Sequence, residues 1–391
     1  MKITRRFFAS LLIAVTPLLL SGARTSGDDS KPSQYFAFIG TYTSKTDSKG
    51  IYSFHFDVAT GRLTAMVLAA TTPDPSFLTV AGNEKYFYAV NELSEFDEKK
   101  SGAVTSYSLD RKSGKLTQMN QVPSGGADPC YISFDQNGKY LLVANYTGGS
   151  VSVFPVASDG RIGAASAFVQ HTGSGPNKER QEGPHAHYIA ASADNRFVFV
   201  VDLGLDEVLV YRFDPAEGSL TPNDPPFAKL APGAGPRHLA FHPNGKFAYV
   251  LNEVNSTVTA FTYDSKNGSF STLQTLSTIP KDFTAHNDTA EIVVHPSGKF
   301  LYASNRGRDS IAEFAIDPAK GTLTLAGDFS TQGKTPRNFA LDPTGKFLLV
   351  ANQESNNIVV FRIDQSTGAL TATGQVAQVP APVDIVFVPA K

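Results

Sequence analysis

The most restrictive feature of this sequence is an internal repeat. Residues 236–264 read PRHLAFHPNGKFAYVLNEVNSTVTAFTYD, and residues 336–364 read PRNFALDPTGKFLLVANQESNNIVVFRID. Residues 292–317 carry the same pattern, and weaker copies begin near Pro75, Pro129 and Pro184. A basic–aromatic pair shared by the copies recurs every 47 to 57 residues, at Lys85-Tyr86, Lys139-Tyr140, Arg196-Phe197, Lys246-Phe247, Lys299-Phe300 and Lys346-Phe347. That spacing suits a unit of four β-strands.

Each copy divides into strands and turns in the same way. A short apolar strand, as in His238–His242, meets a Pro-x-Gly turn, and a second strand follows at Lys246–Asn252. A polar loop then leads to an alternating strand, as in Thr257–Phe261, before a glycine-containing turn and a last strand. Alternation with a period of two and many β-branched and aromatic residues favour strands over helices. We expect an all-β fold of four-stranded antiparallel blades.

The two ends of the repeat region complement each other. The seventh copy begins at Gln34-Tyr35 and lacks its first strand, whereas residues 383–389, VDIVFVP, match a first strand and have no partner after them. If this last strand completes the first blade, the chain closes into a ring without an exposed sheet edge. The sequence therefore predicts one domain over residues 35–391, a seven-bladed β-propeller.

The N-terminus has a different composition. Lys2, Arg5 and Arg6 precede an apolar run over residues 7–20 and the small residues at 21–23. This order is typical of a signal peptide, which we expect to cover residues 1–23 and to be of the twin-arginine type. The apolar run is too short to span a bilayer comfortably as a membrane anchor. Residues 24–34 are expected to be a disordered lead-in. We therefore expect export to the periplasm or the medium, with no membrane segment in the mature protein.

Charge and cysteine content narrow the possible functions. The formal net charge of −2 argues against a nucleic-acid or basic membrane-surface protein, which leaves small molecules as the expected partners. The single cysteine, Cys130, excludes an intramolecular disulfide, a zinc ribbon and a thiolate cluster.

Comparison of the copies separates recurrent residues from variable ones. The second strand ends in an asparagine or aspartate, which we expect to bond backbone amides in tight turns: Asn91, Asn145, Asp202, Asn252, Asn305 and Asn352. His242 and His295 recur before the Pro-x-Gly turn, and we interpret them as turn residues. Recurrence at one position of the repeat points to a role in the blade.

The variable positions predict a functional face. The start of the first strand and the end of the second must share one rim, opposite the hairpin turn that joins them. At the strand starts stand Ser76, Cys130, His187, Arg237, Ala290, Arg337 and Val383, and just beyond the strand ends Thr41, Glu92, Tyr146, Leu203, Glu253, Arg306 and Gln353. Taken singly, each charged residue among them is more simply explained as a solvated residue of the rim than as part of a site. Together, titratable groups of both signs at a concave mouth indicate a ligand site.

Several long motifs resemble those of the seven-bladed β-propeller lactonases, a family that includes propeller-type 6-phosphogluconolactonases and carboxy-muconate cyclases. They are GPHAH (183–187), GPRHLAFHPNGK (235–246), LNE (251–253), VHPSGKFLYASNRG (294–307) and RNFALDPTGKFLLVANQ (337–353). The resemblance covers about residues 35–389. It implies a lactone hydrolase of sugar-type lactones without a metal or other cofactor, and a catalytic set of His187, Arg237, Glu253 and Arg306.

These residue types suit ester hydrolysis. Glu253 or His187 can serve as the base that activates water, and Arg237 or Arg306 can stabilise the oxyanion. The loop 173–183, with Lys178 and Arg180, enters the same face and is expected to help bind an anion or cover the site. No Gly-x-Ser-x-Gly motif supports a serine nucleophile. Further substrate-binding candidates near the mouth are His185, His238, His286, Glu92, Arg337 and Asn338.

Two alternatives remain open at this point. The first is a non-catalytic exported propeller that binds a small ligand or a protein through the same mouth. The second is a calcium-dependent lactonase, in which oxygen ligands come from Glu92, Asn145, Asp202 and Glu253. The resemblance implies 6-phosphogluconolactone as one substrate, but sugar phosphates are scarce outside the cytoplasm, so the export signal points to an unphosphorylated aldonolactone or another cyclic ester.

Overall fold

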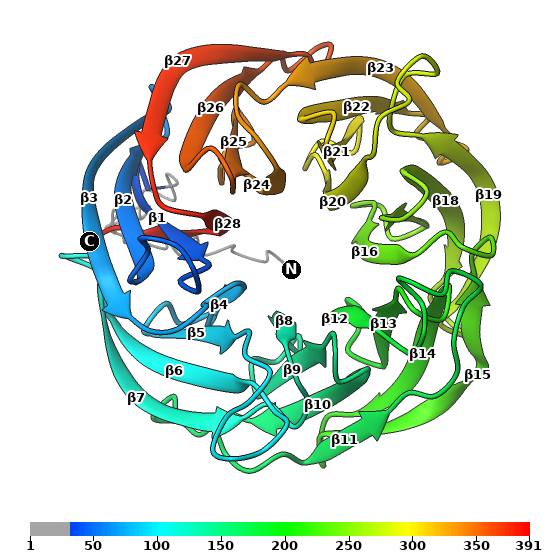
Figure 1. The fold of residues 1–391 in the computed structure, drawn as a ribbon, viewed down its shortest axis with the longest axis horizontal. Helices are drawn as coiled ribbons and strands as arrows, with labels where there is room; N and C mark the ends of the chain where they lie inside the picture. The colour runs from blue at the N-terminus through cyan, green and yellow to red at the C-terminus, as the bar shows by residue number, and fades with distance from the viewer. Residues whose placement is uncertain (1–31) are drawn as a thin grey trace, which may run out of the picture. The chain divides into compact units, whose positions relative to one another are not determined.

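A computed structural model describes residues 32–391, which form seven four-stranded antiparallel sheets and no helix. The predicted signal peptide and most of the lead-in lie outside the described residues. The first strand begins at Gln34, inside the predicted lead-in. Figure 1 shows the seven sheets following one another around a central axis, as expected for a seven-bladed β-propeller.

The strands fall into seven blades, which we number along the chain. Blade 1 consists of β28 (Pro382–Pro389), β1 (Gln34–Thr41), β2 (Gly50–Asp57) and β3 (Arg62–Thr71). Blade 2 consists of β4 (Leu78–Val80), β5 (Tyr86–Asn91), β6 (Ala103–Asp110) and β7 (Lys115–Pro123). Blade 3 consists of β8 (Pro129–Phe134), β9 (Tyr140–Asn145), β10 (Ser150–Pro155) and β11 (Ala167–Gln170).

The remaining blades have the same strand order. Blade 4 consists of β12 (Ala186–Ala191), β13 (Phe197–Asp202), β14 (Glu207–Asp214) and β15 (Ser219–Lys229). Blade 5 consists of β16 (Pro236–Phe241), β17 (Phe247–Asn252), β18 (Thr257–Asp264) and β19 (Ser269–Ser277). Blade 6 consists of β20 (Asp288–Val294), β21 (Phe300–Arg306), β22 (Ser310–Ile316) and β23 (Leu323–Ser330). Blade 7 consists of β24 (Pro336–Leu341), β25 (Phe347–Asn352), β26 (Asn357–Ile363) and β27 (Leu370–Gln378).

The ring closes through the last strand, as the sequence predicts. The C-terminal strand β28 pairs antiparallel with β1, with Ile39 opposite Ile385 and Tyr35 opposite Pro389. The first strand of each blade lies nearest the axis in Figure 1. The two ends of the described chain therefore share one sheet, and the inner edge of every blade faces the central channel.

The core lies between neighbouring blades. Each of the seven apolar clusters joins residues of two adjacent blades; one of them joins Tyr35, Ala37 and Ile39 of blade 1 to Leu349 and Val360 of blade 7. The alternate residues Phe36 and Phe38 of the same strand pack against blade 2. Because both faces of a blade are covered, its middle strands are apolar almost throughout.

A bulge near the start of the inner strand distinguishes six of the seven blades. The register between the first two strands shifts by one residue there. In blade 5, for example, Pro236 pairs with Asn252 and His238 pairs with Leu251, so Arg237 between them has no partner residue on the second strand. A bulge re-aims side chains that would otherwise alternate. As a result, consecutive residues such as Arg237 and His238 line one small void in the channel.

The polar residues at the strand ends are structural, and Asp202 bonds backbone amides as expected, because its Oδ1 accepts from the His185 and Gly204 amides at 2.8 and 3.0 Å. The asparagines have other partners than expected: their side-chain amides donate to carbonyls and hydroxyls. Asn305 Nδ2, for example, donates to Thr278 O at 3.0 Å and Ser310 Oγ at 3.4 Å. The donors thus tie the second strand to the connection that enters the same blade from the preceding one. His242 and His295 lie in turns as predicted, and each Nε2 reaches a glycine carbonyl of the following blade, Gly298 or Gly345.

Residues 32–391 contain no helical segment with the length and apolar character needed to cross a bilayer.

Candidate active site at the mouth of the channel

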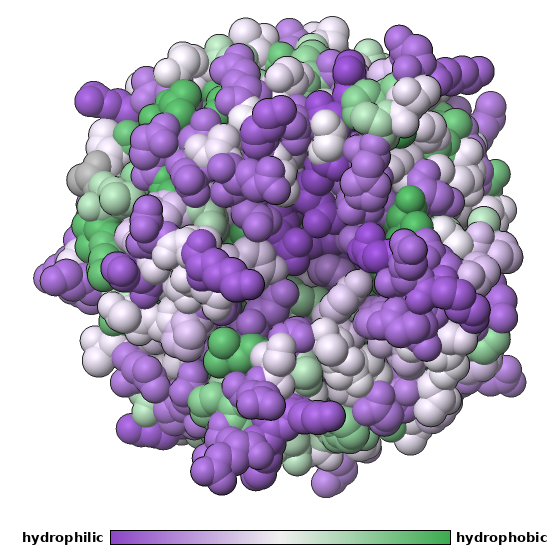
Figure 2. Space-filling model, viewed as in Figure 1, coloured by the Kyte–Doolittle hydropathy of each residue, from purple (hydrophilic) through white to green (hydrophobic). Residues whose placement is uncertain are grey.

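A cavity of about 240 Å³ lies at the mouth of the channel. Figure 2 shows a hollow at the centre of the face in view, surrounded mainly by hydrophilic residues. The cavity lining combines residues from both predicted rings with two others: Glu92, Cys130, Tyr146, Arg180, His187, Glu253, Asp288, Arg306 and Arg337. Six blades and one loop contribute to it, so the closed ring is what assembles the site.

Glu253, which follows β17, is the centre of a cluster of three arginines. Its Oε2 lies 2.9 Å from Arg237 Nε and 3.0 Å from Arg306 Nη2, and its Oε1 accepts from Arg180 Nη2 at 2.5 Å. The Arg237 Nε–H is not aligned for a hydrogen bond, so that contact is purely ionic. Burial alone would raise the pKa of Glu253, but the three guanidinium groups lower it to about 2. Glu253 is therefore a carboxylate at neutral pH.

Arg237 lies beneath this cluster and is nearly inaccessible, with 3% of its surface exposed. Its Nη1 donates to the Ala290 carbonyl of the next blade. Burial, together with the nearby charges of Arg306 and Arg337, lowers the pKa of Arg237 to about 10, which leaves it protonated at neutral pH. Arg306 is less deeply buried, and its Nη2 also donates to the Thr289 carbonyl at 2.8 Å. Protein contacts thus fix both guanidinium groups in place.

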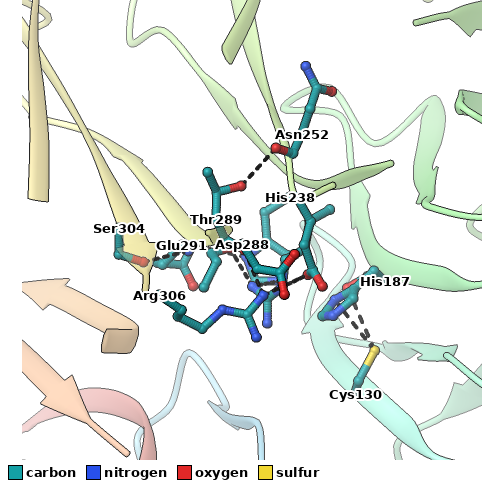
Figure 3. A network of polar contacts seen from close by, with 12 residues as sticks. Cys130, His187, His238, Asn252, Asp288, Thr289, Glu291, Ser304 and Arg306 are labelled. Carbon is teal, nitrogen blue, oxygen red and sulfur yellow. Dashed lines mark hydrogen bonds and ion pairs between the residues drawn. The ribbon is translucent and has the colours of Figure 1, made fainter. Parts of the chain in front are cut away.

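His187, from the bulge of β12, supplies a neutral nitrogen base. Burial lowers its pKa well below 6.5, and the positive charge of Arg237 lowers it further. Its Nδ1 lies 3.6 Å from Cys130 Sγ. Figure 3 shows the His187 ring and the Arg306 side chain approaching one central region from separate strands. Burial raises the pKa of the Cys130 thiol well above 9.0, which makes Cys130 a poor nucleophile.

Arg337 is the arginine of the cavity that lacks a carboxylate partner. Within residues 32–391, no group forms a hydrogen bond or ion pair with its guanidinium, which lies over the Tyr42 ring at 5.2 Å. The Tyr42 hydroxyl donates to Glu92 Oε1 at 2.9 Å, and burial raises the pKa of Glu92. The Arg337 donors are therefore available to a ligand.

A second layer of polar residues lies deeper in the channel. His238 Nδ1 is 3.0 Å from Glu291 Oε1, and Asn338 Nδ2 donates to Glu291 Oε2 at 2.8 Å. Arg237 Nη1 lies 3.3 Å from His238 Nε2, so this layer supports the arginine above it. His238 and Asn338, both predicted to bind substrate, do not line the mouth cavity but the void of about 10 Å³ beneath it.

Two other predicted residues lie away from the cavity lining. The His185 ring stacks on Tyr146 with ring centroids 4.5 Å apart, and its Nδ1 is 3.1 Å from the Tyr146 carbonyl. The His286 side chain is 82% exposed, and its Nε2 lies 3.1 Å from Asp288 Oδ2. Of the predicted catalytic residues, His187, Glu253 and Arg306 line the mouth cavity with Glu92 and Arg337, and Arg237 contacts Glu253 while lining the small void instead.

Asp288 and Tyr42 were missed at the sequence level. Asp288, the first residue of β20, stands two residues before the rim position Ala290, and two other copies carry an aspartate at the same place, Asp74 and Asp128. Recurrence therefore made it look structural. Tyr42 lies one residue beyond the predicted ring, and only its contacts with Glu92 and Arg337 mark it. Of the two basic residues in the 173–183 loop, Arg180 reaches the cavity and Lys178 is exposed.

The residues proposed for a calcium site have other partners. Asn145 Nδ2 donates to Ser124 O and Ser150 Oγ, and Asp202 binds His171 Nδ1 at 2.6 Å. In the part of the chain that the structure describes, no three His, Cys, Asp or Glu side chains are arranged to hold a metal ion. These contacts do not favour the calcium alternative, and a cofactor-free enzyme remains a prediction.

Comparisons with known proteins agree with this fold and identify the family. The family model for the seven-bladed β-propeller lactonases matches residues 36–387. A 6-phosphogluconolactonase of Bacillus subtilis is 39% identical over 309 residues, which cover 79% of this chain and 85% of that protein. A periplasmic gluconolactonase of Pseudomonas aeruginosa is 37% identical, with a TM-score of 0.87 over 92% of this chain and 100% of that structure.

The chain therefore belongs to the seven-bladed β-propeller lactonase family. Because a lactone is a cyclic ester, this family places it among the carboxylic-ester hydrolases, as the sequence motifs predicted.

Proposed function

We propose that the protein hydrolyses a sugar-type lactone in the mouth cavity, with His187 as the general base. The observation that carries this proposal is the convergence, on one cavity, of a neutral histidine with fixed arginines and an ionised glutamate. Hydrolysis of a lactone needs a proton acceptor for the attacking water and positive groups for the oxyanion. The cavity offers both kinds of group.

The electrostatics favour His187 over Glu253 as the base. A carboxylate whose pKa is about 2 has little tendency to take a proton, and three guanidinium groups already occupy the oxygens of Glu253. His187 is uncharged at neutral pH, so one ring nitrogen carries a lone pair. In our proposal Nδ1 bears the hydrogen and faces Cys130 Sγ, and Nε2 accepts the proton of water. Glu253 then acts as the counter-ion that holds the arginines.

The arginines receive the negative charge that develops. Water attacks the lactone carbonyl carbon while His187 takes one of its protons, and the carbonyl oxygen becomes an oxyanion. Arg306 and Arg337, which line the cavity, donate to that oxyanion. The bond from the carbonyl carbon to the ring oxygen then breaks. His187 returns its proton to the ring oxygen, and the product hydroxy acid releases a proton to solvent.

Among sugar lactones, we propose an unphosphorylated aldonolactone such as δ-gluconolactone. Two relatives bear on this choice, the 6-phosphogluconolactonase of Bacillus subtilis and the periplasmic gluconolactonase of Pseudomonas aeruginosa. The N-terminal sequence predicts export, which favours the second comparison. A periplasmic location of the mature chain is part of this proposal.

A proton-release assay on residues 24–391 tests the proposal. δ-Gluconolactone and its 6-phosphate are compared at equal concentration against spontaneous hydrolysis. We expect hydrolysis well above the spontaneous rate, faster without the phosphate, and its loss in His187→Asn. A folded sample that hydrolyses neither lactone would contradict the proposed function and favour a binding protein. Preference for the 6-phosphate would contradict only the proposed substrate.

A further inference from the structure

One connection between blades differs from the others. Residues 171–185, between β11 and β12, form the longest link between consecutive blades in the described chain; the next longest, between β19 and β20, covers residues 278–287. Figure 1 shows it among the green segments that join blades 3 and 4. We call residues 172–184 the arm. In a repeat protein, an insertion in one copy serves something other than the repeat.

A buried aspartate holds both ends of the arm. The second strand of blade 4 ends in Asp202, whereas five other copies carry an asparagine at this position. Its Oδ2 lies 2.6 Å from His171 Nδ1, just before the arm, and its Oδ1 accepts from the His185 amide at 2.8 Å, just after it. Both side chains of the Asp202–His171 pair are almost fully buried. The aspartate that departs from the repeat, Asp202, therefore anchors both ends of the arm.

A second anchor stands next to Arg180. Gln181 is fully buried, and its Nε2 donates to Leu203 O and Asp206 Oδ1, both at 2.8 Å. Its Oε1 accepts from the Asn177 amide at 3.1 Å. These bonds hold the backbone of the arm on either side of Arg180. The arm is thus a built element, and the position of Arg180 is determined by it.

Arg180 reaches from the arm across to blades 5 and 6. Its Nη2 donates to Glu253 Oε1 at 2.5 Å, and its Nη1 lies 3.4 Å from Asp288 Oδ1. Arg237 and Arg306 both occupy the other oxygen, Oε2. Without Arg180, Glu253 Oε1 would face the cavity, and the carboxylate would be free to rotate away from Arg237 and Arg306.

We propose that Arg180 is a positioning residue for lactone hydrolysis, delivered by the arm to hold Glu253 from the cavity side. This inference rests on the proposed function for its role in the reaction. Arg180 keeps the Glu253 carboxylate in the one orientation that presents Oε2 to Arg237 and Arg306. Arg306, one of the two arginines proposed to meet the oxyanion, is thereby held in place before substrate arrives.

Kinetics of three variants test this role. Arg180→Met removes the guanidinium, Arg180→Lys retains a charge with less reach, and Lys178→Met removes an exposed charge from the same arm as a matched control. With the lactone that the native protein hydrolyses, we expect Arg180→Met to lower kcat by about 10- to 100-fold while KM changes less than about threefold. Arg180→Lys should recover part of the loss, and Lys178→Met should behave as the native protein.

A double-mutant cycle tests whether the arm acts through Arg180. Gln181→Ala loosens the arm without touching the cavity, and we expect it to lower kcat in the native background. In the Arg180→Met background the same change should have no further effect, because the contact that it weakens is already gone. Additive losses from the two changes would overturn the role given to the arm.

A titration of Glu253 separates this inference from the proposed function. The side-chain carboxyl is followed by NMR in ¹³C-labelled protein, with assignment by Glu253→Gln. We expect Arg180→Met to raise the titration midpoint of Glu253, and Lys178→Met to leave it unchanged. An unchanged midpoint in Arg180→Met would overturn the inference, as would a native kcat or an effect on KM alone. If the native protein hydrolyses no lactone, the proposed function fails, and the NMR result alone decides the Arg180–Glu253 contact.

Discussion

His187 and Glu253 line the same cavity, but their surroundings favour the neutral form of the first and the charged form of the second. His187 is surrounded by buried groups and cations, which favour its neutral form. Glu253 is equally buried, but three guanidinium groups favour its charged form. The difference lies in the partners that each residue meets, because burial by itself penalises the charged form of both.

The pH dependence of hydrolysis follows from the lowered pKa of His187. A base whose pKa lies below 6.5 loses activity only when protonated, so kcat/KM should stay constant as pH falls from 7.5 through 6.5 and decline at lower pH. His187→Asn should lower kcat by about 100- to 10,000-fold and remove this acid limb. A pH–rate profile of both proteins measures it. A limb centred at or above pH 6.5 would contradict the assignment.

Glu313, in blade 6, predicts a pH effect on stability. It is 2% exposed, and its Oε1 has no hydrogen-bond partner within residues 32–391. Burial raises its pKa from 4.5 to about 7. Since the folded state favours the protonated form, this group's contribution to stability is present below pH 4.5 and is lost as pH rises to about 7.

We therefore expect Glu313→Gln to raise the free energy of unfolding by about 1–3 kcal/mol at pH 8. At pH 4.5 the two proteins should be nearly equal. Chemical denaturation of both proteins at the two pH values measures the difference. A stabilisation of equal size at both pH values would point to packing instead of ionisation.

At the scale of strands, bulges and polar strand ends build the site on the repeat. The bulges at the inner strands turn consecutive residues toward the channel, so Arg237 can meet Glu253 while His238 binds Glu291 below. A regular strand would send every second side chain away from the channel. The strand-end asparagines hold the connections between blades, and the rim residues that follow them are thereby positioned.

Asn352 offers a test of that role away from the cavity. Its Nδ2 donates to Thr331 O at 3.3 Å and to Asn357 Oδ1 at 3.0 Å. Asn352→Ala removes the donor from the buried Thr331 carbonyl and one of the two donors to Asn357 Oδ1, the other being Ser355 Oγ, and should lower the free energy of unfolding by about 1–3 kcal/mol. Lactone hydrolysis should be unchanged, because the residue that follows, Gln353, does not line the mouth cavity. Denaturation and kinetics on one preparation test both expectations; unchanged stability would contradict the first.

At the scale of the whole molecule, ring closure decides whether the site exists. The cavity takes residues from six blades, and β28 contributes Ile385 to the core between blades 7 and 1 and Val388 to that between blades 1 and 2. Loss of β28 would expose both cores and an unpaired edge of β1.

Removal of residues 382–391 should therefore abolish cooperative thermal unfolding and lactone hydrolysis together. The milder Ile385→Ala should keep the fold and lower the free energy of unfolding by about 2–5 kcal/mol. Circular dichroism melts of both variants check these outcomes. A truncated protein that melts cooperatively at the native temperature would show that closure by β28 is dispensable.

The repeat, the four-stranded blade, closure by the last strand and the rim shared by the variable positions were all predictable from sequence. They depend on alternating polarity and turn chemistry, which each short segment carries within itself. The proposal of His187 over Glu253 as base depends on the folded ring. The pairing of Glu253 with Arg180, the position of Asp288 in the cavity lining and the contacts of Tyr42 with Glu92 and Arg337 also came only from the folded ring. Protonation and pairing depend on groups brought within a few ångströms from other blades, and no local pattern encodes those distances.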